Sequence, residues 1–144
     1  MRNLTVKDKD TLLDIADAAR LFARPKISGF HVGAALLDSK GRIYRGCNVE
    51  FDNYTNTIHA EVGAIAAAMV AGATKILMVA VVVDGKKPMF PCGMCLQSLY
   101  EIGGPDLVVL AGCNKGFFVD QMLMKELYPQ PFGHRNIGDP KCFP

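Results

Sequence analysis

The chain has 144 residues, of which 50% are hydrophobic and 21% are charged, and this composition is typical of one globular domain. Its longest apolar run, residues 76–83, is too short to span a bilayer, and the polar N-terminus lacks the apolar core of a signal peptide. We therefore expect a cytoplasmic protein without a membrane partner. The basic residues are scattered and the net charge is only +2, which argues against a nucleic-acid partner. Five cysteines without a disulfide framework favour thiols or metal ligands.

The predicted elements follow one another with short loops between them. Apolar residues at helical spacing predict a first helix that Pro25 ends, and later apolar runs predict strands. In chain order we expect a helix at 8–23, strands at 30–38 and 41–50, a polar loop at 51–57, a helix at 58–73, a strand at 75–84, a helix at 92–104, strands at 106–112 and 116–120, and a helix at 121–129. This order predicts an α/β fold, a three-layer α/β/α sandwich with a mixed sheet of about five strands. We expect one domain over 1–144, in which 139–144 could form a flexible tail.

Three residues with metal-binding side chains stand at the starts of two predicted helices. His59 opens one helix, Cys92 and Cys95 open the next, and one central strand lies between them. Consecutive crossover units bring their helix starts to the same edge of a sheet, so the three side chains can converge. One imidazole and two thiolates suit zinc, and three protein ligands leave a position open for water, as in catalytic zinc sites.

Two alternatives for these cysteines stay open, a redox pair and a structural zinc site with a fourth ligand. The redox interpretation lacks a thioredoxin-like context. None of the other cysteines is spaced as a partner for a structural site, and we expect them to be small buried thiols or tail thiols: Cys47, Cys113 and Cys142.

A glutamate stands two residues after His59. Glu61 lies in a predicted helix that is apolar on nearly all sides, where an unpartnered carboxylate would be costly. It can reach a water molecule at the metal and act as its general base. The order His-x-Glu followed by Pro-Cys-x-x-Cys is the signature of zinc-dependent nucleobase deaminases. Together the two motifs therefore predict a catalytic zinc site with Glu61 as the catalytic residue.

Beyond the zinc motif, the chain resembles the cytidine deaminases from about residue 16 to residue 138. Five segments carry the resemblance: SGFHVGAALL at 28–37, GCNVE at 46–50, TIHAE at 57–61, PCGMCLQ at 91–97 and LYPQPFG at 127–133. The resemblance implies one Zn²⁺ per subunit and a small-molecule pyrimidine nucleoside as substrate.

The resemblance also implies substrate-binding roles for residues outside the zinc motif. Asn48 and Glu50 match residues that hydrogen-bond the ribose hydroxyls, and their alternate positions at a strand end suit a sugar's neighbouring hydroxyls. Phe30 matches a residue that packs against the pyrimidine, and Ala60 is placed at the substrate between His59 and Glu61.

Two further matches point to an oligomer. Phe132 matches a residue that closes the base from another subunit, and Tyr54 one that reaches a neighbouring subunit's site. We therefore expect a homotetramer. The small, apolar residues of the 58–73 helix permit a close helix–helix contact at an interface, although a simply buried helix explains them equally well.

The chain departs from the pattern of the small cytidine deaminases at several positions. Cysteine is usual in place of His59, and arginine is usual in place of Val62 and Leu96. Three thiolates on Zn²⁺ leave a net charge of −1 that arginines can offset, whereas one imidazole and two thiolates leave a neutral site. These changes therefore agree with one another and support His59 as a ligand. Phe51 stands where asparagine is usual, which leaves the exact substrate open.

The function that the resemblance implies is hydrolytic deamination of cytidine and 2′-deoxycytidine in pyrimidine salvage. Glu61 would take a proton from the attacking water and deliver protons to N3 and to the departing amine. One alternative keeps this chemistry on an aminopyrimidine nucleoside antibiotic such as blasticidin S. Another is a non-catalytic zinc-binding module. A polynucleotide deaminase is disfavoured because the chain lacks a basic groove and an aromatic stacking platform.

Overall fold

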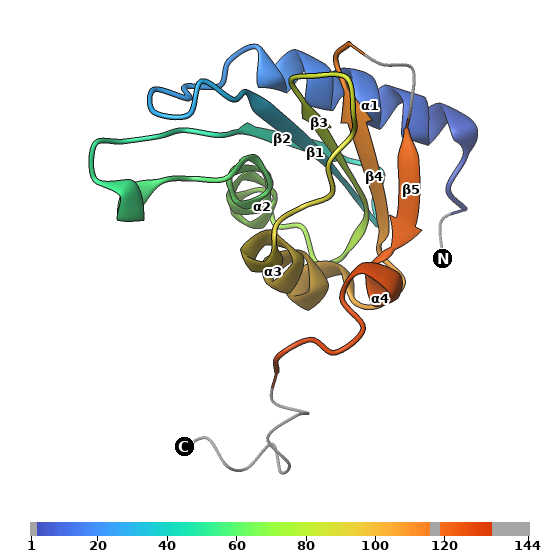
Figure 1. Cartoon of the computed structure of the whole chain (residues 1–144). Helices are drawn as coiled ribbons and strands as arrows, with labels where there is room; N and C mark the ends of the chain where they lie inside the picture. Colours follow the sequence, from blue (N-terminus) through green and yellow to red (C-terminus); the bar gives the residue numbers. More distant parts are fainter. Residues whose placement is uncertain (1–2, 116–118, 134–144) are drawn as a thin grey trace, which may run out of the picture.

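The computed structural model describes residues 3–115 and 119–133, which form three layers (Figure 1). Helix α1 lies on one face of a five-stranded sheet, and α2 and α3 lie on the other. The elements in chain order are α1 Val6–Arg20, β1 Val32–Asp38, β2 Ile43–Cys47, the 3₁₀ helix η1 Tyr54–Asn56, α2 Ala60–Val70, β3 Ile76–Val83, α3 Gly93–Gly103, β4 Val108–Cys113, β5 Asp120–Leu123 and α4 Met124–Leu127. No helix within these residues is long and apolar enough to cross a membrane.

The strand order in the sheet is β2-β1-β3-β4-β5. The β3–β4 pair is parallel and the other pairs are antiparallel, which confirms the predicted mixed sheet. Because β1 runs antiparallel to both of its neighbours, β2 and β3 point in the same direction. Helix α2 follows β2 and α3 follows β3, so both helices begin at the same edge of the sheet.

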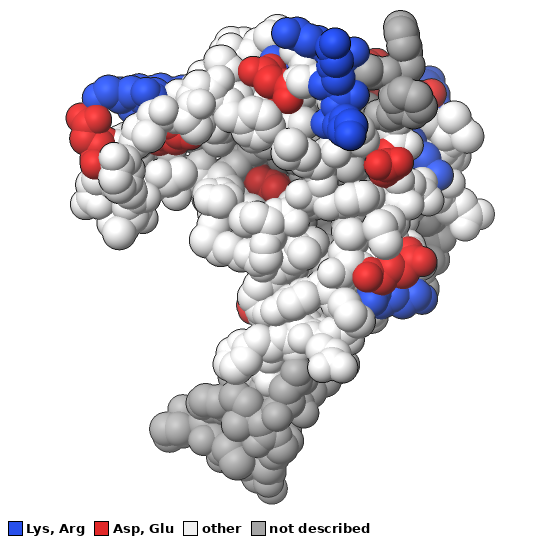
Figure 2. All heavy atoms as spheres, in the orientation of Figure 1, with Lys and Arg blue, Asp and Glu red and all other residues white. Residues whose placement is uncertain are grey.

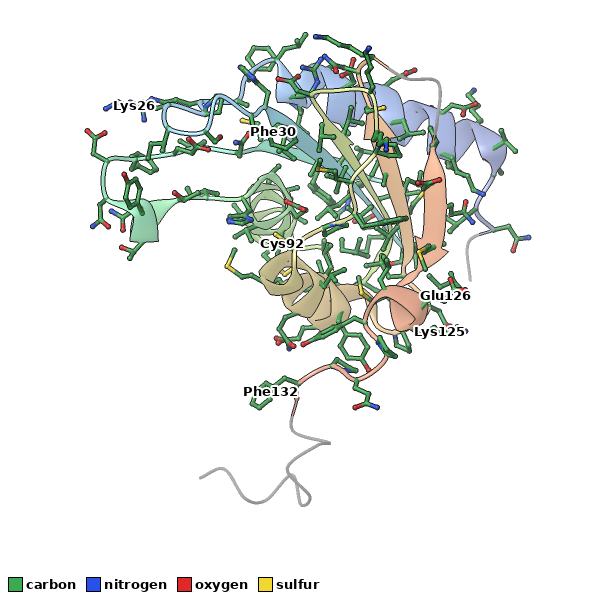
Figure 3. The ribbon with its side chains drawn as sticks, in the orientation of Figure 1. Lys26, Phe30, Cys92, Lys125, Glu126 and Phe132 are labelled. Carbon is green, nitrogen blue, oxygen red and sulfur yellow. The ribbon has the colours of Figure 1, made fainter. Side chains whose placement is uncertain are left out.

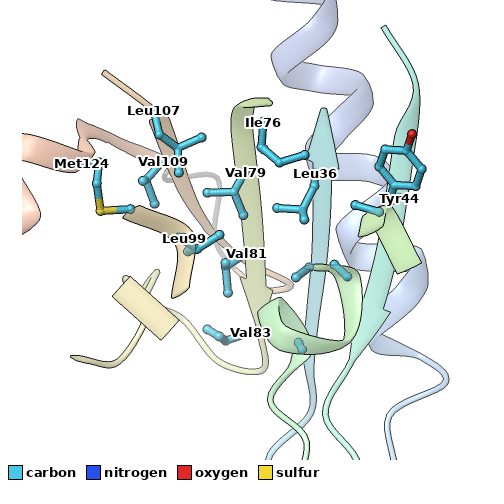
Figure 4. Packing of buried hydrophobic residues seen from close by; sticks show 14 of the residues in the cluster. Leu36, Tyr44, Ile76, Val79, Val81, Val83, Leu99, Leu107, Val109 and Met124 are labelled. Carbon is cyan, nitrogen blue, oxygen red and sulfur yellow. The ribbon is translucent and has the colours of Figure 1, made fainter. Parts of the chain in front are cut away.

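Strand β3 lies at the centre of the sheet and is buried on both faces, as its continuous apolar sequence predicted. Val79 and Val81 pack beneath α2 and α3 (Figure 4). Met78 and Ala80 point to the opposite face and pack beneath α1. Burying a valine or methionine side chain stabilises the fold by about 1.5–3 kcal/mol. The sheet thus forms a rigid base for the loops at its edge.

A glycine on the sheet sets how closely α2 can approach. The α carbon of Gly46, in β2, faces the first turn of α2, and a Cβ at this position would overlap the backbone of Ala60 and Ala64. Any other residue would push the start of the helix outward. Gly46 therefore holds His59, the residue before α2, close to the sheet edge.

The predicted elements near the C-terminus differ from the structure at one place. A helix was predicted from 121, but Asp120–Leu123 form strand β5, and only Met124–Leu127 are helical. The physical reason is that β5 supplies hydrogen-bond partners to the outer edge of β4, which would otherwise be unpaired. The 116–120 strand prediction falls largely on residues 116–118, which lie outside the described residues, as do Cys142 and the 139–144 tail.

A buried carboxylate ties the turn between β1 and β2 together. Asp38 accepts hydrogen bonds from the backbone nitrogens of Lys40 and Arg42, from the Arg42 guanidinium and from the Tyr44 hydroxyl. Arg42 also donates to the carbonyl oxygens of Ala71 and Gly72 after α2. Burial raises the pKa of Asp38, but its hydrogen bonds outweigh burial and hold the pKa below its usual value of 3.8.

Replacing Asp38 by asparagine is expected to lower the free energy of unfolding by about 2–4 kcal/mol. The asparagine side chain carries an NH2 group in place of one carboxylate oxygen, so donors that bonded to that oxygen would face another donor. The stabilisation by Asp38 is complete well above pH 3.8, the unfolded value, and is lost as the pH falls through the lowered folded pKa. Urea unfolding at pH 7 and pH 3 should therefore show a smaller difference between the two proteins at pH 3. Asp106→Asn, at an exposed ion pair with Lys125, is the control and should change stability by less than about 0.5 kcal/mol.

Candidate active site

The three predicted metal ligands meet at the starts of α2 and α3. His59 precedes α2 and Cys92 precedes α3, and neither side chain makes a capping hydrogen bond to its helix. Instead, Nδ1 of His59 lies 3.5 Å from Sγ of Cys92 and 3.5 Å from Sγ of Cys95. The structure therefore brings together side chains from two segments more than thirty residues apart in the sequence.

The spacing of these three atoms fits a zinc ion. Bonds of about 2.0–2.3 Å in a tetrahedral site place the ligand atoms roughly 3.5–3.8 Å apart, which matches the distances from His59. The three ligand atoms all lie within 4.8 Å of one another. In residues 3–115 and 119–133 no fourth histidine, cysteine or carboxylate joins this group, as expected where one coordination position stays open for chemistry.

The electrostatics of the cluster also favour a cation. Burial, together with the charges of Glu61 and Cys92, raises the pKa of the Cys95 thiol, so a thiolate is costly there without a positive charge. A divalent cation reverses this cost by stabilising both thiolates. With zinc the His59–Cys92–Cys95 set sums to zero charge, and among the described residues no lysine or arginine pairs with it.

Glu61 lies in the first turn of α2, two residues after His59. Only 5% of its surface is exposed, and it borders the same pocket as His59 and Cys92. A carboxylate in the first turn is favoured by the positive end of the helix dipole. The position thus places an acid–base group beside the metal ligands without making it one of them.

A pocket of about 270 Å³ opens in front of this cluster, near the lower end of the range for small-molecule sites. Figure 2 shows a recess near the centre of this face with acidic atoms at its floor. The pocket brings together most of the residues predicted from the sequence: Phe30, Asn48, Glu50, His59, Ala60, Glu61 and Cys92. Cys95 lies behind its wall and is fully buried.

Asn48 and Glu50 lie just after β2 and line the same pocket. The Asn48 amide accepts a hydrogen bond from the nitrogen of Val32 at 2.8 Å and donates one to the carbonyl of Phe30 at 2.9 Å. The Glu50 carboxylate accepts hydrogen bonds from the nitrogens of Ile27 and Ser28 at 2.7 and 2.9 Å. Both side chains are buried, at 8% exposure, and both shape the loop that carries Phe30.

Tyr54 and Phe132 lie outside the pocket of their own chain. Tyr54 belongs to η1 in a projecting arm and is 73% exposed, and Phe132 is 66% exposed. Figure 3 shows Phe132 on the segment that leaves the body after α4, apart from Phe30 and Cys92. The side chain of Gln97 on α3 fixes this segment by donating to the Phe132 carbonyl at 3.0 Å. Neither aromatic ring therefore closes the pocket of its own chain.

Several residues of the pocket wall were not found by sequence reasoning. Ser28 was within reach, because it opens the segment that also contains Phe30. Val32, in β1, and Thr57, before α2, were also within reach, because they lie in the 28–37 and 57–61 segments. The others come from β3 and from the loop before α3, and no local signal marks them as site residues: Val81, Val83, Met89 and Phe90.

Comparison with known proteins gives consistent matches. The family model for the cytidine and deoxycytidylate deaminase zinc-binding region matches residues 6–111, which include all three candidate ligands. The chain is similar to a cytidine deaminase of Halalkalibacterium halodurans, with 36% identity over 132 residues, 92% of this chain and 99% of that protein. A cytidine deaminase of Sporosarcina psychrophila is 34% identical over 131 residues, 91% of this chain and 96% of its own length.

A solved structure agrees with these matches. The crystal structure of cytidine deaminase from Burkholderia pseudomallei superposes with a TM-score of 0.82 at 34% sequence identity. The superposition covers 90% of this chain and 100% of that chain. The similarity therefore extends over the sheet, the helices and the pocket together.

Proposed function

Since the chain belongs to the cytidine and deoxycytidylate deaminase zinc-binding family, we propose that it catalyses hydrolytic deamination of cytidine and 2′-deoxycytidine. The observation that carries the proposal is the convergence of His59, Cys92 and Cys95 beside the buried carboxylate of Glu61 in one pocket. Water replaces the amino group at C4, so the products are uridine or 2′-deoxyuridine and ammonia.

The acid–base work falls to Glu61. Zinc held by the imidazole and the two thiolates would supply a Lewis acid that makes water nucleophilic near neutral pH. The Glu61 carboxylate accepts one proton from the attacking water and passes it to N3 of the pyrimidine. It then accepts the second proton, from the hydroxyl formed at C4, and passes it to the departing amine as the C4–N bond breaks. Because Glu61 is almost fully buried, bulk water does not compete for these protons.

The walls of the pocket orient the nucleoside for this step. Phe30 offers an apolar surface to the pyrimidine, and the backbone around Ala60 lies beside the base. Asn48 and Glu50 line the same pocket as His59 and Cys92, where they can meet the sugar. A substrate held at the base and at the sugar presents C4 to the zinc site in a fixed orientation.

The two alternative functions are not favoured by the comparisons. The matched relatives and the matched solved structure are cytidine deaminases. Ammonia release by the zinc-loaded protein from cytidine, 2′-deoxycytidine, cytosine and blasticidin S tests the proposal directly. We expect turnover of the first two nucleosides. Turnover of blasticidin S alone, or bound zinc without turnover of any compound, would contradict it.

We also propose a cytoplasmic homotetramer that acts in pyrimidine salvage and completes each site with residues of its neighbours. Helix α2 has an uncharged, partly exposed face in which Met69 is 42% and Val70 is 92% exposed. Such a face is costly in water and suits close helix packing between copies. Phe132 projects away from the body (Figure 3), and Tyr54 is 73% exposed on η1, so both rings can reach a neighbouring pocket.

Light scattering should therefore give a mass of about four times the 15.6 kDa of one chain. Phe132→Ala should lower activity, because it opens the site of a neighbour. A mixture of Phe132→Ala and Glu61→Gln subunits, exchanged in mild denaturant, should regain part of the activity, since some sites then receive an intact Glu61 and an intact Phe132. A monomeric protein, or a mixture no more active than its components, would refute completion across subunits.

A further inference from the structure

The hydroxyl of Ser28 connects two residues of the pocket wall. Its Oγ donates to Oε1 of Glu50 at 2.6 Å and accepts from the backbone nitrogen of Phe30 at 3.0 Å. Gly29, between them, has a φ of +68°, a left-handed conformation that glycine adopts without strain. A Cβ at Gly29 would meet no atom within 4 Å, so this backbone turn, rather than crowding, accounts for the glycine.

The hydrogen bonds at Glu50 leave little free capacity. A carboxylate has about four acceptor positions. The nitrogens of Ile27 and Ser28 occupy both positions on Oε2, and the Ser28 hydroxyl occupies one on Oε1. One position on Oε1 therefore remains open, and Glu50 is a residue that borders the pocket.

Asn48 has a complementary capacity. Its side chain uses one of two amide hydrogens on the Phe30 carbonyl and one of two oxygen lone pairs on the Val32 nitrogen. One donor remains on Asn48 and one acceptor remains on Glu50. A sugar hydroxyl, which accepts one hydrogen bond and donates one, can satisfy both groups at once.

We infer that Ser28 is a positioning residue for the sugar of the nucleoside, because its hydroxyl fixes the Glu50 carboxylate with one acceptor turned toward the pocket. This inference rests on the proposed function, in which Glu50 meets the sugar. Without the hydroxyl, Oε1 has two open positions and the carboxylate can rotate to satisfy them with water. The hydrogen bonds from Ser28 and Ile27 outweigh burial and hold the pKa of Glu50 below its usual value, so the group is an acceptor at neutral pH.

The test compares a ligand that carries the 2′- and 3′-hydroxyls of the sugar with a ligand that lacks them. The zinc-loaded wild-type protein and Ser28→Ala are assayed for KM and kcat with cytidine, and for the inhibition constant of 2′,3′-dideoxycytidine against cytidine. We expect Ser28→Ala to raise the KM for cytidine about tenfold and to change kcat by less than about threefold. The inhibition constant of 2′,3′-dideoxycytidine, which lacks the 2′- and 3′-hydroxyls but keeps the 5′-hydroxyl, should change by less than about threefold.

Two matched variants complete the experiment. Ser28→Thr keeps the hydroxyl and should restore the KM of the wild type, whereas Ser39→Ala removes a serine hydroxyl from the exposed turn after β1 and should leave both constants unchanged. Ser28 lies in an exposed loop, so melting temperatures should stay close to that of the wild type.

Three results would overturn the inference. These are an equal loss for cytidine and for the dideoxy compound, unchanged constants in Ser28→Ala, or a Ser28→Thr protein that behaves like Ser28→Ala. A wild-type protein that releases no ammonia from cytidine is a different result, because it overturns the proposed function itself.

Discussion

Replacing Glu61 by glutamine is expected to reduce kcat for cytidine by about a thousandfold or more while zinc remains bound. The glutamine amide has the same shape but can neither take a proton from water nor return one to the pyrimidine. Acid–base catalysis by a positioned group contributes about 10²–10⁴ in rate, and here one carboxylate serves several proton transfers. Ammonia release measures the loss, and metal analysis of the same sample measures zinc.

The control for this variant is Asp106→Asn, which also converts a carboxylate into an amide but at the surface near Lys125. It should keep wild-type kcat and zinc content. If Glu61→Gln kept more than about a tenth of wild-type kcat, Glu61 could not be the proton carrier. If it lost zinc along with activity, the carboxylate would belong to the metal site rather than to the proton path.

Replacing Cys95 by serine is expected to abolish both zinc binding and turnover. Cys95 is fully buried, and its thiolate is one of the three candidate ligand atoms that the described part of the chain brings together. A neutral serine hydroxyl removes one soft, charged ligand, and we expect zinc affinity to fall more than about a hundredfold. Competition with a chromogenic zinc chelator measures the affinity, and ammonia release measures turnover.

Cys113→Ser is the matched control, because Cys113 is also a buried thiol but lies on β4, outside the ligand group. It should bind zinc with unchanged affinity and lose at most about 1–2 kcal/mol of stability through burial of a hydroxyl. Stoichiometric zinc of unchanged affinity in Cys95→Ser would rule out Cys95 as a ligand. Equal zinc loss in both variants would assign the effect to the fold instead.

The strongest local patterns in the sequence predicted the elements best. The continuous apolar run of β3 indicated a strand buried on both faces, and it is the central strand of the sheet. The prediction failed at 121–123, where the residues have no strong strand pattern of their own. Their conformation depends on pairing with β4, a contact that only the folded chain provides.

The same distinction between local patterns and contacts of the folded chain applies to the candidate site. The sequence predicted the candidate zinc ligands and the acid–base group beside them, because His59, Glu61, Cys92 and Cys95 stand at fixed offsets from helix starts, and such offsets are local. The contacts between side chains of the pocket wall came from the folded chain. Ser28 meets Glu50, 22 residues away, because the loop before β1 packs beside the segment after β2. Hydrogen bonds of this kind depend on the pairing of distant segments, and a pattern within one segment does not record them.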